Sequence, residues 1–421
     1  MGKLIFRRNT CRLCKSKNLA CVLSLSPTPI GEGYVRKEAL NIRQEMYPVD
    51  LFLCKNCGHV QLLDIIEPGE LYRHYIYKTS HSLGLVNHFD KYAEWVIAKL
   101  NLSNNNLVAD VGSNDGSLLK AFKKKGMKVI GVDPAVDIAK EATNAGVKTY
   151  ADFFTEDVAE KIKKEEGQSM VITMNNAFAN IDDLDEIIKG IKILMSKEGV
   201  FIFETGYVFD VLQKIIFDNI YHEHLSYFSV KSAQNFLLKH GLEIIDLEHV
   251  PTKGGSIRCI VQFKDGPKKI QTSVFDFLKL ESDFSIHDLK TYETFGKNIS
   301  LMKDQTHALI KNLKSKGKKI IGYGASITVT GVLFNFGLDN SLIDFIVDDN
   351  PIRHNLYSPG MHIPVYSSEK IHEDNPDYVI ILAWQYAKPI ISRNQKYLEN
   401  GGSFIVFQPQ LRVINKYNYE G

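Results

Sequence analysis

The stretch Leu107-Val-Ala-Asp-Val-Gly-Ser-Asn-Asp-Gly-Ser-Leu-Leu119 decides the fold. Its apolar beginning, which runs to Val111, predicts a buried strand, and the apolar spacing of Ser117–Lys125 predicts a helix. Gly112 and Gly116 lie in the turn between them, where a missing side chain lets the backbone come close to a ligand. Strand, glycine turn and helix together predict the first unit of a doubly wound, nucleotide-binding sheet.

The acids near this turn indicate the ligand. Asp110 and Asp115 flank the turn, and the next predicted strand, Met127–Asp133, ends in a third acid that can accept hydrogen bonds from ribose hydroxyls. Carboxylates repel a pyrophosphate but attract the ammonium and sulfonium groups of S-adenosylmethionine (SAM). The pattern therefore favours SAM over NAD, and the alternative is an ordinary turn with solvated acids.

Later strands of the same sheet add cofactor candidates. Gly146–Tyr150, Ser169–Met174 and Gly199–Glu204 are predicted as its third, fourth and fifth strands. Ligands bind outside the carboxyl ends of parallel strands, so the loops after these strands should lie together at one edge of the sheet and line one binding site. After the third strand an acid and an aromatic ring can reach an adenine, although the acid could instead cap the next helix. The predicted cofactor residues are Asp110, Gly112, Asn114, Asp115, Gly116, Asp133, Asp152, Phe153 and Asn175.

Length and composition are those of a multidomain enzyme. A chain of 421 residues is long enough for about two to four domains. The net charge of +2 argues against a dedicated nucleic-acid partner. The N-terminus has no long apolar run followed by a cleavage site, and no segment approaches the length of a membrane span. We therefore expect a cytoplasmic, monomeric enzyme that acts on a small molecule.

Four of the six cysteines form two C-x-x-C pairs. Cys11 and Cys14 make the first pair, Cys54 and Cys57 the second, and two such knuckles converge readily on one tetrahedral zinc ion. A disulfide pair does not suit a chain without a secretion signal, and a redox C-x-x-C normally occurs singly beside a βαβ unit. We predict a structural Zn²⁺ site on these four thiolates, with neighbouring His59 as a surface residue and not a ligand.

The segment Ile220-Tyr-His-Glu-His-Leu-Ser-Tyr-Phe228 is rich in groups that exchange protons. It lacks the H-E-x-x-H spacing of zinc proteases. His222 and His224 could share a metal if the segment were extended, because alternate residues of a strand share a face. Acid–base catalysis is favoured, since histidine titrates near neutrality and Glu223 can orient it. The alternative is one buried and one exposed histidine, neither with a chemical role.

A second α/β region follows. Lys318–Ser326 has the pattern of a strand that enters a glycine turn, Leu342–Asp348 that of a strand ending in acids, and Tyr378–Trp384 and Gly402–Phe407 those of two more buried strands. The helix N-terminus after Gly324 could receive a phosphate group.

Together these motifs resemble the sugar C-methyltransferase family, which acts on nucleotide-linked deoxy-keto sugars. The resemblance is carried by the two C-x-x-C pairs, D-V-G-S-N-D-G, G-V-D-P, Y-H-E-H-L-S-Y-F-S, G-G-S-I-R and G-Y-G-A-S followed by V-D-D-N-P. It covers nearly the whole chain and implies an α/β fold in three domains. These are a zinc-binding domain at 1–70, a Rossmann-like class I SAM-dependent methyltransferase domain at 71–265, and a second Rossmann-like domain at 266–421 that binds the nucleotide sugar.

The resemblance also implies roles for individual residues. His224 would be the base, with Glu223 and Tyr221 beside it, and Tyr75 or Tyr77 would reach the sugar from the linker after the zinc-binding domain. The residues expected to bind the substrate are Asn176, Asn180, His222, Arg258, Gly324, Ser326 and Asp348.

Two positions depart from the family pattern. The family carries a histidine after the fourth strand, where this chain has Asn180, whose amide cannot exchange protons as an imidazole does. The family's G-A-S-A-K-G-N-T is here Gly324-Ala-Ser-Ile-Thr-Val-Thr-Gly331, without the lysine.

The predicted reaction is methylation of the carbon next to a ketone. The ketone makes that C–H bond acidic, because the enolate spreads its charge onto oxygen, and a histidine would take the proton. The alternatives are an O- or N-methyltransferase acting on a nucleotide-linked sugar, and a non-catalytic module that binds zinc and a nucleotide.

Overall fold

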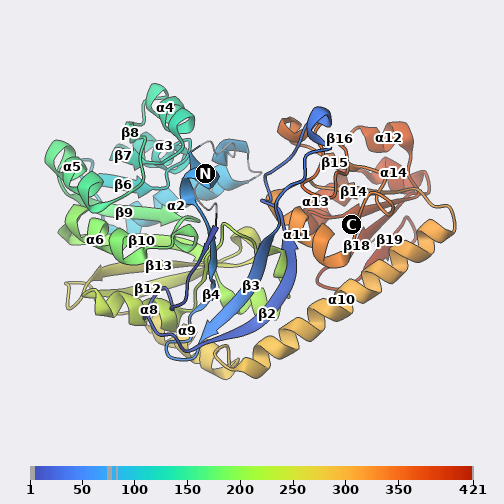
Figure 1. Ribbon diagram of the computed structural model, residues 1–421. Coiled ribbons are helices and arrows are strands. Elements are labelled where there is room, and N and C mark those ends of the chain that lie inside the picture. Colours follow the sequence, from blue (N-terminus) through green and yellow to red (C-terminus); the bar gives the residue numbers. More distant parts are fainter. Residues whose placement is uncertain (1–4, 74–77, 82–83, 420–421) are drawn as a thin grey trace. The chain divides into compact units, whose positions relative to one another are not determined.

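The computed structural model describes residues 5–73, 78–81 and 84–419 (Figure 1). The chain divides into two compact units, and both are discontinuous in sequence. The first unit consists of Met1–Ala20, Leu53–Phe209 and Leu225–His287, and the second of Cys21–Phe52, Asp210–His224 and Asp288–Gly421. The domain boundaries at residues 70 and 265 stay a prediction. No helix within the described ranges is long and apolar enough to cross a membrane.

The first unit is built on a seven-stranded sheet in the order β12-β13-β10-β9-β6-β7-β8. Six strands run in the same direction, and β13 is antiparallel to its two neighbours, β10 and β12. The chain leaves β6 for β7 and β8 and then returns to β9 and β10 on the other side, so the order reverses between β6 and β9. Doubly wound sheets bind their ligands at this reversal. The strands are β6 (Leu107–Val111), β7 (Lys128–Val132), β8 (Thr149–Tyr150), β9 (Ser169–Asn175), β10 (Met195–Gly206), β12 (Leu242–Val250) and β13 (Ser256–Phe263), which confirms the five strands predicted for this sheet.

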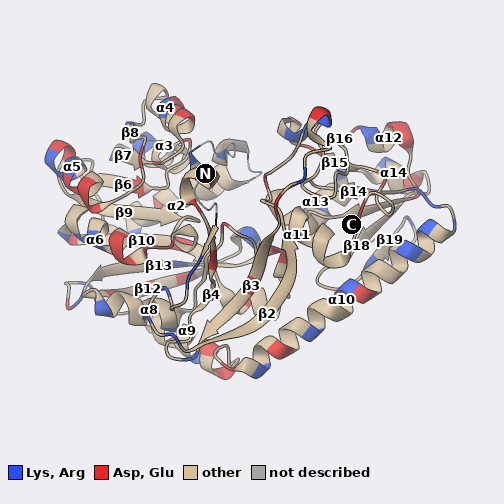
Figure 2. Cartoon of the chain, in the orientation of Figure 1, with Lys and Arg blue, Asp and Glu red and all other residues tan. Residues whose placement is uncertain are grey.

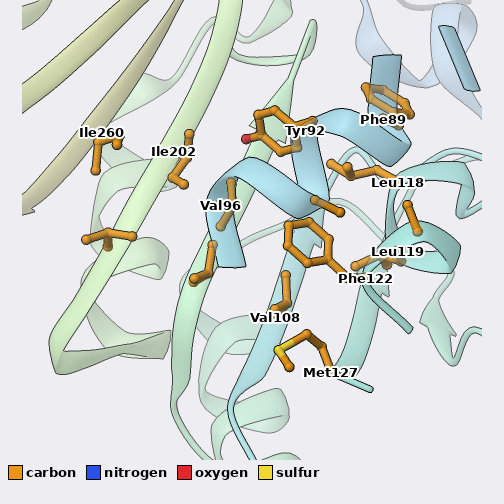
Figure 3. Packing of buried hydrophobic residues seen from close by; sticks show 14 of the residues in the cluster. Phe89, Tyr92, Val96, Val108, Leu118, Leu119, Phe122, Met127, Ile202 and Ile260 are labelled. Atoms are coloured by element: carbon orange, nitrogen blue, oxygen red, sulfur yellow. The ribbon is translucent and has the colours of Figure 1, made fainter. Parts of the chain in front are cut away.

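Helices α2 (Leu85–Leu100) and α3 (Ser117–Lys124) pack together against this sheet. Figure 3 shows Tyr92 and Val96 of α2 and Phe122 of α3 near Val108 and Ile202 of the strands, and each of these residues is at most 1% exposed. Residues four apart lie on one face of a helix, which is why the apolar spacing of Ser117–Lys125 predicted α3. Burying one such aromatic side chain contributes roughly 1.5–3 kcal/mol.

The other face of the sheet carries an aromatic cluster. Phe201 and Phe203 of β10 alternate with the residues that face α2 and α3, so their side chains point the opposite way. Both rings pack against Phe178, which stacks on Phe228 with ring centroids 5.1 Å apart and planes 13° apart. This stack holds the end of the histidine-rich segment on the first unit.

Strands of the N-terminal region belong to the same unit. β1 (Ile5–Arg7) pairs with β5 (Asp64–Ile66), and β4 (Val60–Leu62) pairs with β11 (Ser226–Tyr227), both antiparallel. The residues just after His224 are therefore strand partners of the residues just after the second C-x-x-C pair. The remaining helices of this unit are α1 (Pro68–Tyr72), α4 (Val136–Asn144), α5 (Glu156–Glu166), α6 (Leu184–Leu194), α8 (Val230–Lys239) and α9 (Thr272–Asp283), while α7 (Val208–Gln213) spans the boundary between the units.

The second unit holds a six-stranded sheet in the order β16-β15-β14-β17-β18-β19, parallel except for β19. β15 begins at Ile346 and not at Leu342 as predicted, because the Leu342 amide donates to Asp339 O in a turn. The other strands are β14 (Ile320–Tyr323), β16 (Val365–Ser367), β17 (Tyr378–Ile381), β18 (Ser403–Val406) and β19 (Arg412–Ile414), and the helices are α10 (Leu289–Ser315), α11 (Ile327–Phe336), α12 (Lys370–Asp374), α13 (Ala387–Arg393) and α14 (Gln395–Glu399).

Two further strands, β2 (Leu19–Thr28) and β3 (Tyr47–Cys54), are neighbours and lie largely in the second unit. Figure 2 shows basic and acidic residues interspersed along α10, as on an ordinary solvated helix.

Candidate active site

The turn after β6 has a backbone that favours glycine. The φ angle is +75° at Gly112 and +72° at Gly116, in the left-handed region. A Cβ atom added to Gly112 would lie 2.8 Å from the Cβ of Ala177, in the segment that follows β9. The space between the ends of β6 and β9 is therefore lined by backbone at this point, as close approach of a ligand requires.

Asp133, directly after β7, is bound to this turn. Its Oδ2 accepts a hydrogen bond from the Asn114 amide at 2.8 Å, and its Oδ1 accepts one from the Ala135 amide at 2.9 Å. Burial raises the pKa of Asp133. A carboxylate has about four acceptor sites, so two remain for ribose hydroxyls.

Asn114 and Asp115 hold the chain segment that precedes α2. Asn114 Oδ1 accepts from the Thr79 amide and Asp115 Oδ2 from the Ser80 amide, both at 2.9 Å. Burial alone would raise the pKa of Asp115, but hydrogen bonds from Ser117 and Ser80 outweigh it and lower the pKa. Local sequence pattern could not indicate these contacts, because the partners lie 35 residues away.

Asp110, at the end of β6, is the more deeply buried of the two acids that flank the turn. It is 4% exposed and accepts a hydrogen bond from Thr173 Oγ1 at 2.6 Å. Burial, with help from the charge of Asp133, raises the pKa of Asp110 to about 7. A carboxyl group with a pKa close to neutrality loses its proton readily when a cation binds nearby.

Asp152 and Phe153 follow β8 at the surface. The Phe153 amide donates to Asp152 Oδ1 at 2.9 Å, and the Arg73 guanidinium lies 5.3 Å from the Phe153 ring centroid. The cap of α5 is Thr155, whose Oγ1 accepts from the Val158 amide. The alternative that Asp152 caps this helix is therefore wrong.

Asparagines line the end of β9. Asn175 ends the strand, and Asn176 has a φ of +55° and donates its amide to Glu204 O at 2.7 Å. Asn180 has a buried Oδ1 with no hydrogen-bond partner among the described residues. Such an orphaned acceptor suits a ligand with a donor group. With the backbone-lined turn and the strand-end carboxylates, it makes this region fit SAM.

Arg258 lies in a buried network that the sequence did not reveal. Its Nη2 and Nε donate to Glu204 Oε2 at 2.8 and 3.0 Å, and its Cζ lies 4.1 Å from the Tyr92 ring centroid. His88 Nε2 and Thr252 Oγ1 bind the other oxygen of Glu204 at 3.1 and 2.9 Å. The charge of Arg258, predicted to serve the substrate, is thus balanced by Glu204.

His224, in the second unit, is held by both ring nitrogens. Nδ1 lies 2.9 Å from Asn219 O, and Nε2 lies 2.9 Å from Tyr221 Oη. A carbonyl oxygen only accepts hydrogen bonds, so Nδ1 carries the proton of the neutral ring. Nε2 therefore has the lone pair, to which the Tyr221 hydroxyl donates. Asn219 and Tyr221 thus contribute to the orientation of the His224 ring, and the orienting role expected for Glu223 stays a prediction.

His222 is turned to a different partner. It is 3% exposed, its Nε2 lies 3.3 Å from Tyr47 O, and burial lowers its pKa to about 4. The segment is a turn closed by the hydrogen bond from the His224 amide to Tyr221 O, so the extended conformation considered for a shared metal is wrong.

The histidine-rich turn is anchored within the second unit. Trp384 Nε1 donates to Asp218 Oδ2 at 2.9 Å, and the Phe217 ring stacks on Phe336 at 5.1 Å between centroids. Glu223 is 4% exposed. Tyr75 and Tyr77, the other predicted catalytic residues, lie outside the described residues.

The second glycine turn repeats the arrangement of the first. Gly324 has a φ of +104°, and an added Cβ would lie 2.4 Å from the Cβ of Ala383. Asp348 at the end of β15 accepts from the Ala325 amide at 2.6 Å and from the Asn350 amide at 2.7 Å. Ser326 is the residue before α11.

The four cysteines come together as predicted. Their sulfur atoms all lie within 4.8 Å of one another, with 3.6 Å between Cys11 and Cys57 and 3.5 Å between Cys14 and Cys54. In a tetrahedral site with Zn–S bonds of about 2.3 Å, the sulfurs lie about 3.8 Å apart, so the cluster fits zinc.

His59 is not the surface residue that was predicted. It is 0% exposed, its Nε2 lies 3.2 Å from Ser226 Oγ, and its ring centroid lies 5.3 Å from that of Phe228. Its partners come from the strand region after the histidine-rich turn, which sequence proximity to the cysteines could not indicate.

Comparisons with known proteins agree with this geometry. Family models match a putative zinc binding domain at residues 11–72, a methyltransferase domain at 87–247 and a C-methyltransferase C-terminal domain at 251–409. C-methyltransferase NovU from Streptomyces niveus is 32% identical over 405 residues, which cover 96% of each chain.

Similar solved structures cover only part of the chain. Magnesium protoporphyrin IX methyltransferase (ChlM) from Synechocystis PCC 6803 with bound SAM is 14% identical over 43% of this chain and 80% of its own, with a TM-score of 0.33. The PH0226 protein from Pyrococcus horikoshii OT3 is 13% identical over 47% of this chain and 98% of its own, with a TM-score of 0.36.

The fold and the family models define a SAM-dependent C-methyltransferase with a structural zinc site. With a relative that matches over nearly its whole length, the chain belongs to the sugar C-methyltransferase family.

We expect about one zinc ion per chain by metal analysis. Cys14→Ser should lower the melting temperature of the first unit and release the metal, because a structural zinc site contributes folding energy directly. Cys21→Ser is the matched control, since Cys21 is exposed and lies outside the cluster. A metal-free protein with an unchanged circular dichroism melt would contradict the prediction.

Asp110 should make stability depend on pH. Its pKa rises from 3.8 to about 7 on folding, so the folded protein keeps a proton that the unfolded chain has released. The free energy of unfolding should therefore fall as pH rises between these two values. In Asp110→Asn this part of the pH dependence should disappear. As pH rises through this range, the free energy of unfolding of the variant should therefore increase relative to the wild type, by up to roughly 1.4 kcal/mol per pKa unit.

Denaturant unfolding at about pH 5 and about pH 8 measures this difference. Asp157→Asn, an exposed position in the first turn of α5, is the control and should follow the wild type. Parallel pH profiles for Asp110→Asn and the wild type would show that Asp110 is already ionised in the folded protein.

Proposed function

We propose that the chain methylates the carbon next to a ketone in a nucleotide-linked deoxy-keto sugar, by way of an enolate. Membership of the family and the C-methyltransferase relative support carbon as the methyl acceptor. A sugar carbon is not nucleophilic unless a neighbouring group stabilises a carbanion, and a ketone does so by taking the charge on oxygen. SAM supplies the electrophilic methyl group, so the protein must supply a base.

The observation that carries the proposal is the hydrogen bond between His224 Nδ1 and the carbonyl oxygen of Asn219. Asn219 O fixes the proton on Nδ1, which leaves the Nε2 lone pair as the basic site. The Asn219 carbonyl also stabilises the imidazolium that forms when Nε2 takes a proton, because Nδ1 stays a donor throughout.

Tyr221 gives the base a partner for the enolate. Its hydroxyl donates to Nε2 at 2.9 Å. When a ketone binds, this O–H can turn to the carbonyl oxygen, which frees Nε2 for the C–H proton and places a donor where negative charge develops. One such donor is worth roughly 3–4 kcal/mol of transition-state stabilisation. We assign Glu223, Tyr75 and Tyr77 to the same site on the resemblance alone.

The second glycine turn is the proposed site for the nucleotide diphosphate. Amides at the start of a helix generally lack partners one turn earlier, so the start of α11 can donate hydrogen bonds to phosphate oxygens. Gly324 permits backbone approach, and Asp348 holds the turn through the Ala325 amide. With this assignment, residues 1–70 bind zinc, 71–265 bind SAM, and 266–421 bind the nucleotide sugar.

For the cofactor, we expect Asp133→Ala to weaken SAM binding. A hydrogen bond to a carboxylate contributes roughly 1.5–3 kcal/mol, so affinity should fall roughly 10- to 150-fold for one lost bond. Calorimetric titration of SAM measures this change. Asp137→Ala, exposed in the first turn of α4, is the matched control. Unchanged affinity in a folded Asp133→Ala protein would place the cofactor elsewhere.

For the base, we expect His224→Ala to lose methyl transfer together with solvent-deuterium exchange at the substrate carbon, while SAM still binds. General-base catalysis contributes roughly 100- to 10,000-fold, so the rate should fall at least that far. Tyr221→Phe should lose less, because Nε2 remains basic. Glu223→Gln should keep part of the activity.

The assay uses SAM and a panel of nucleotide-linked keto sugars, with methyl gain read by mass spectrometry. His240→Ala is the control histidine, since it pairs with Asp185 on the surface of the first unit. Normal deuterium exchange in His224→Ala would assign the base to another group. A methylated product from a sugar without a ketone would favour an O- or N-methyltransferase.

A further inference from the structure

Arg12, between the two cysteines of the first C-x-x-C pair, is fully buried. Its side chain is 0% exposed. Nη1 donates to Leu225 O at 2.7 Å, Nη2 donates to Leu62 O at 3.1 Å, and Nε donates to Asp182 Oδ1 at 3.1 Å. Gln61 Oε1 accepts from the Arg12 backbone amide at 2.9 Å. A single guanidinium group therefore binds three separate parts of the first unit.

These partners surround the residue that follows the proposed base. Leu225 is joined to His224 by a peptide bond, and its amide donates to Ala179 O while its carbonyl accepts from the Leu62 amide and from Arg12. Asp182, the charge partner of Arg12, lies on the same loop as Ala179 and Asn180. Arg12 thus ties the zinc knuckle to the carbonyl of Leu225, while the Leu225 amide is held by Ala179 O.

Burying a guanidinium group to hold strands together costs free energy, because the group loses its hydration. Taking a charged group out of water has this cost even when the group is paired. Apolar side chains would hold β4 against β11 without this cost. The planar guanidinium group adds directional hydrogen bonds, because its donors hold several acceptors in one fixed geometry.

We propose that Arg12 is a positioning residue, through which the zinc site fixes the carbonyl of Leu225, the residue bonded directly to the proposed base. The zinc ion then serves catalysis as well as folding, by holding the knuckle that presents Arg12. The catalytic part of this inference rests on His224 being the base. The contact between Arg12 and Leu225 does not, because its effect on amide exchange can be measured without any reaction.

The test uses the full-length, zinc-loaded protein with Arg12→Lys. Lysine keeps the charge but cannot make the forked contacts. We expect unchanged zinc content and SAM affinity, an unchanged KM, and a kcat lower by roughly 10- to 100-fold, the size of effect that misplacement by about 1 Å produces. Amide hydrogen exchange at Leu225 and Leu62 should become faster, while exchange in β6 stays the same.

Arg7→Lys is the matched control. Arg7 lies on β1 near the same cysteines, pairs with Asp64 at 2.6 Å and has a half-exposed side chain. It should leave kcat and the exchange of Leu225 unchanged. A second variant, Asp182→Asn, removes the charge partner of Arg12 and should change kcat and exchange in the same direction, so the proposal remains testable if Arg12→Lys does not fold.

Two outcomes would overturn the proposal. Normal exchange at Leu225 in a folded variant would show that Arg12 does not hold this peptide. Loss of zinc or of SAM affinity in step with kcat would make Arg12 part of general folding. Failure of the base assignment is recognised separately, by normal substrate deuterium exchange in His224→Ala, and leaves the amide-exchange result to stand by itself.

Discussion

The hydrogen bond from the Asn114 amide to the Asp133 carboxylate holds the end of β7 to the glycine turn after β6. The turn has left-handed residues at Gly112, Asn114 and Gly116, and such a backbone needs an outside partner to keep its shape. The second unit solves the same problem in the same way, with the Ala325 amide and Asp348. In both units the strand-end acid therefore holds the shape of the glycine turn.

Buried charges follow two patterns in this protein. Glu204 is paired with Arg258, and Arg12 with Asp182, so each pair fixes the position of its neighbours. Asp110 has no cationic partner in the described structure, and burial brings its pKa close to neutrality. Paired buried charges give rigidity, because separating them leaves an uncompensated buried charge. Removing one partner lowers the free energy of unfolding by roughly 3–5 kcal/mol. A lone buried acid instead gives a group that responds to a cation.

Much of the fold could be read from local pattern. The strands around the glycine turns, helix α3 and the zinc cysteines all depend on spacing within a short stretch, and these predictions are confirmed. The prediction that His59 lies at the surface was wrong, because its burial depends on Ser226 and Phe228, far along the chain.

The site shows the same limit. The residue types of the histidine-rich segment indicated proton transfer, but not its turn conformation or the bond from His224 to the Asn219 carbonyl. The Glu204–Arg258 network was missed because its members lie on separate strands and a helix. A buried acid at the end of a predicted strand, opposite an arginine on another, is the one signal that could have suggested it.

The order of the segments along the chain has a consequence for biosynthesis. The chain passes between the two units at residues 20/21, 52/53, 209/210, 224/225 and 287/288. During translation the first unit can be completed soon after His287 leaves the ribosome, whereas Cys21–Phe52 and Asp210–His224 must wait for the C-terminal sheet. The segment that carries the histidines therefore reaches its final surroundings only late in synthesis. Such an interleaved protein also cannot be divided by a single cut into two pieces that each fold.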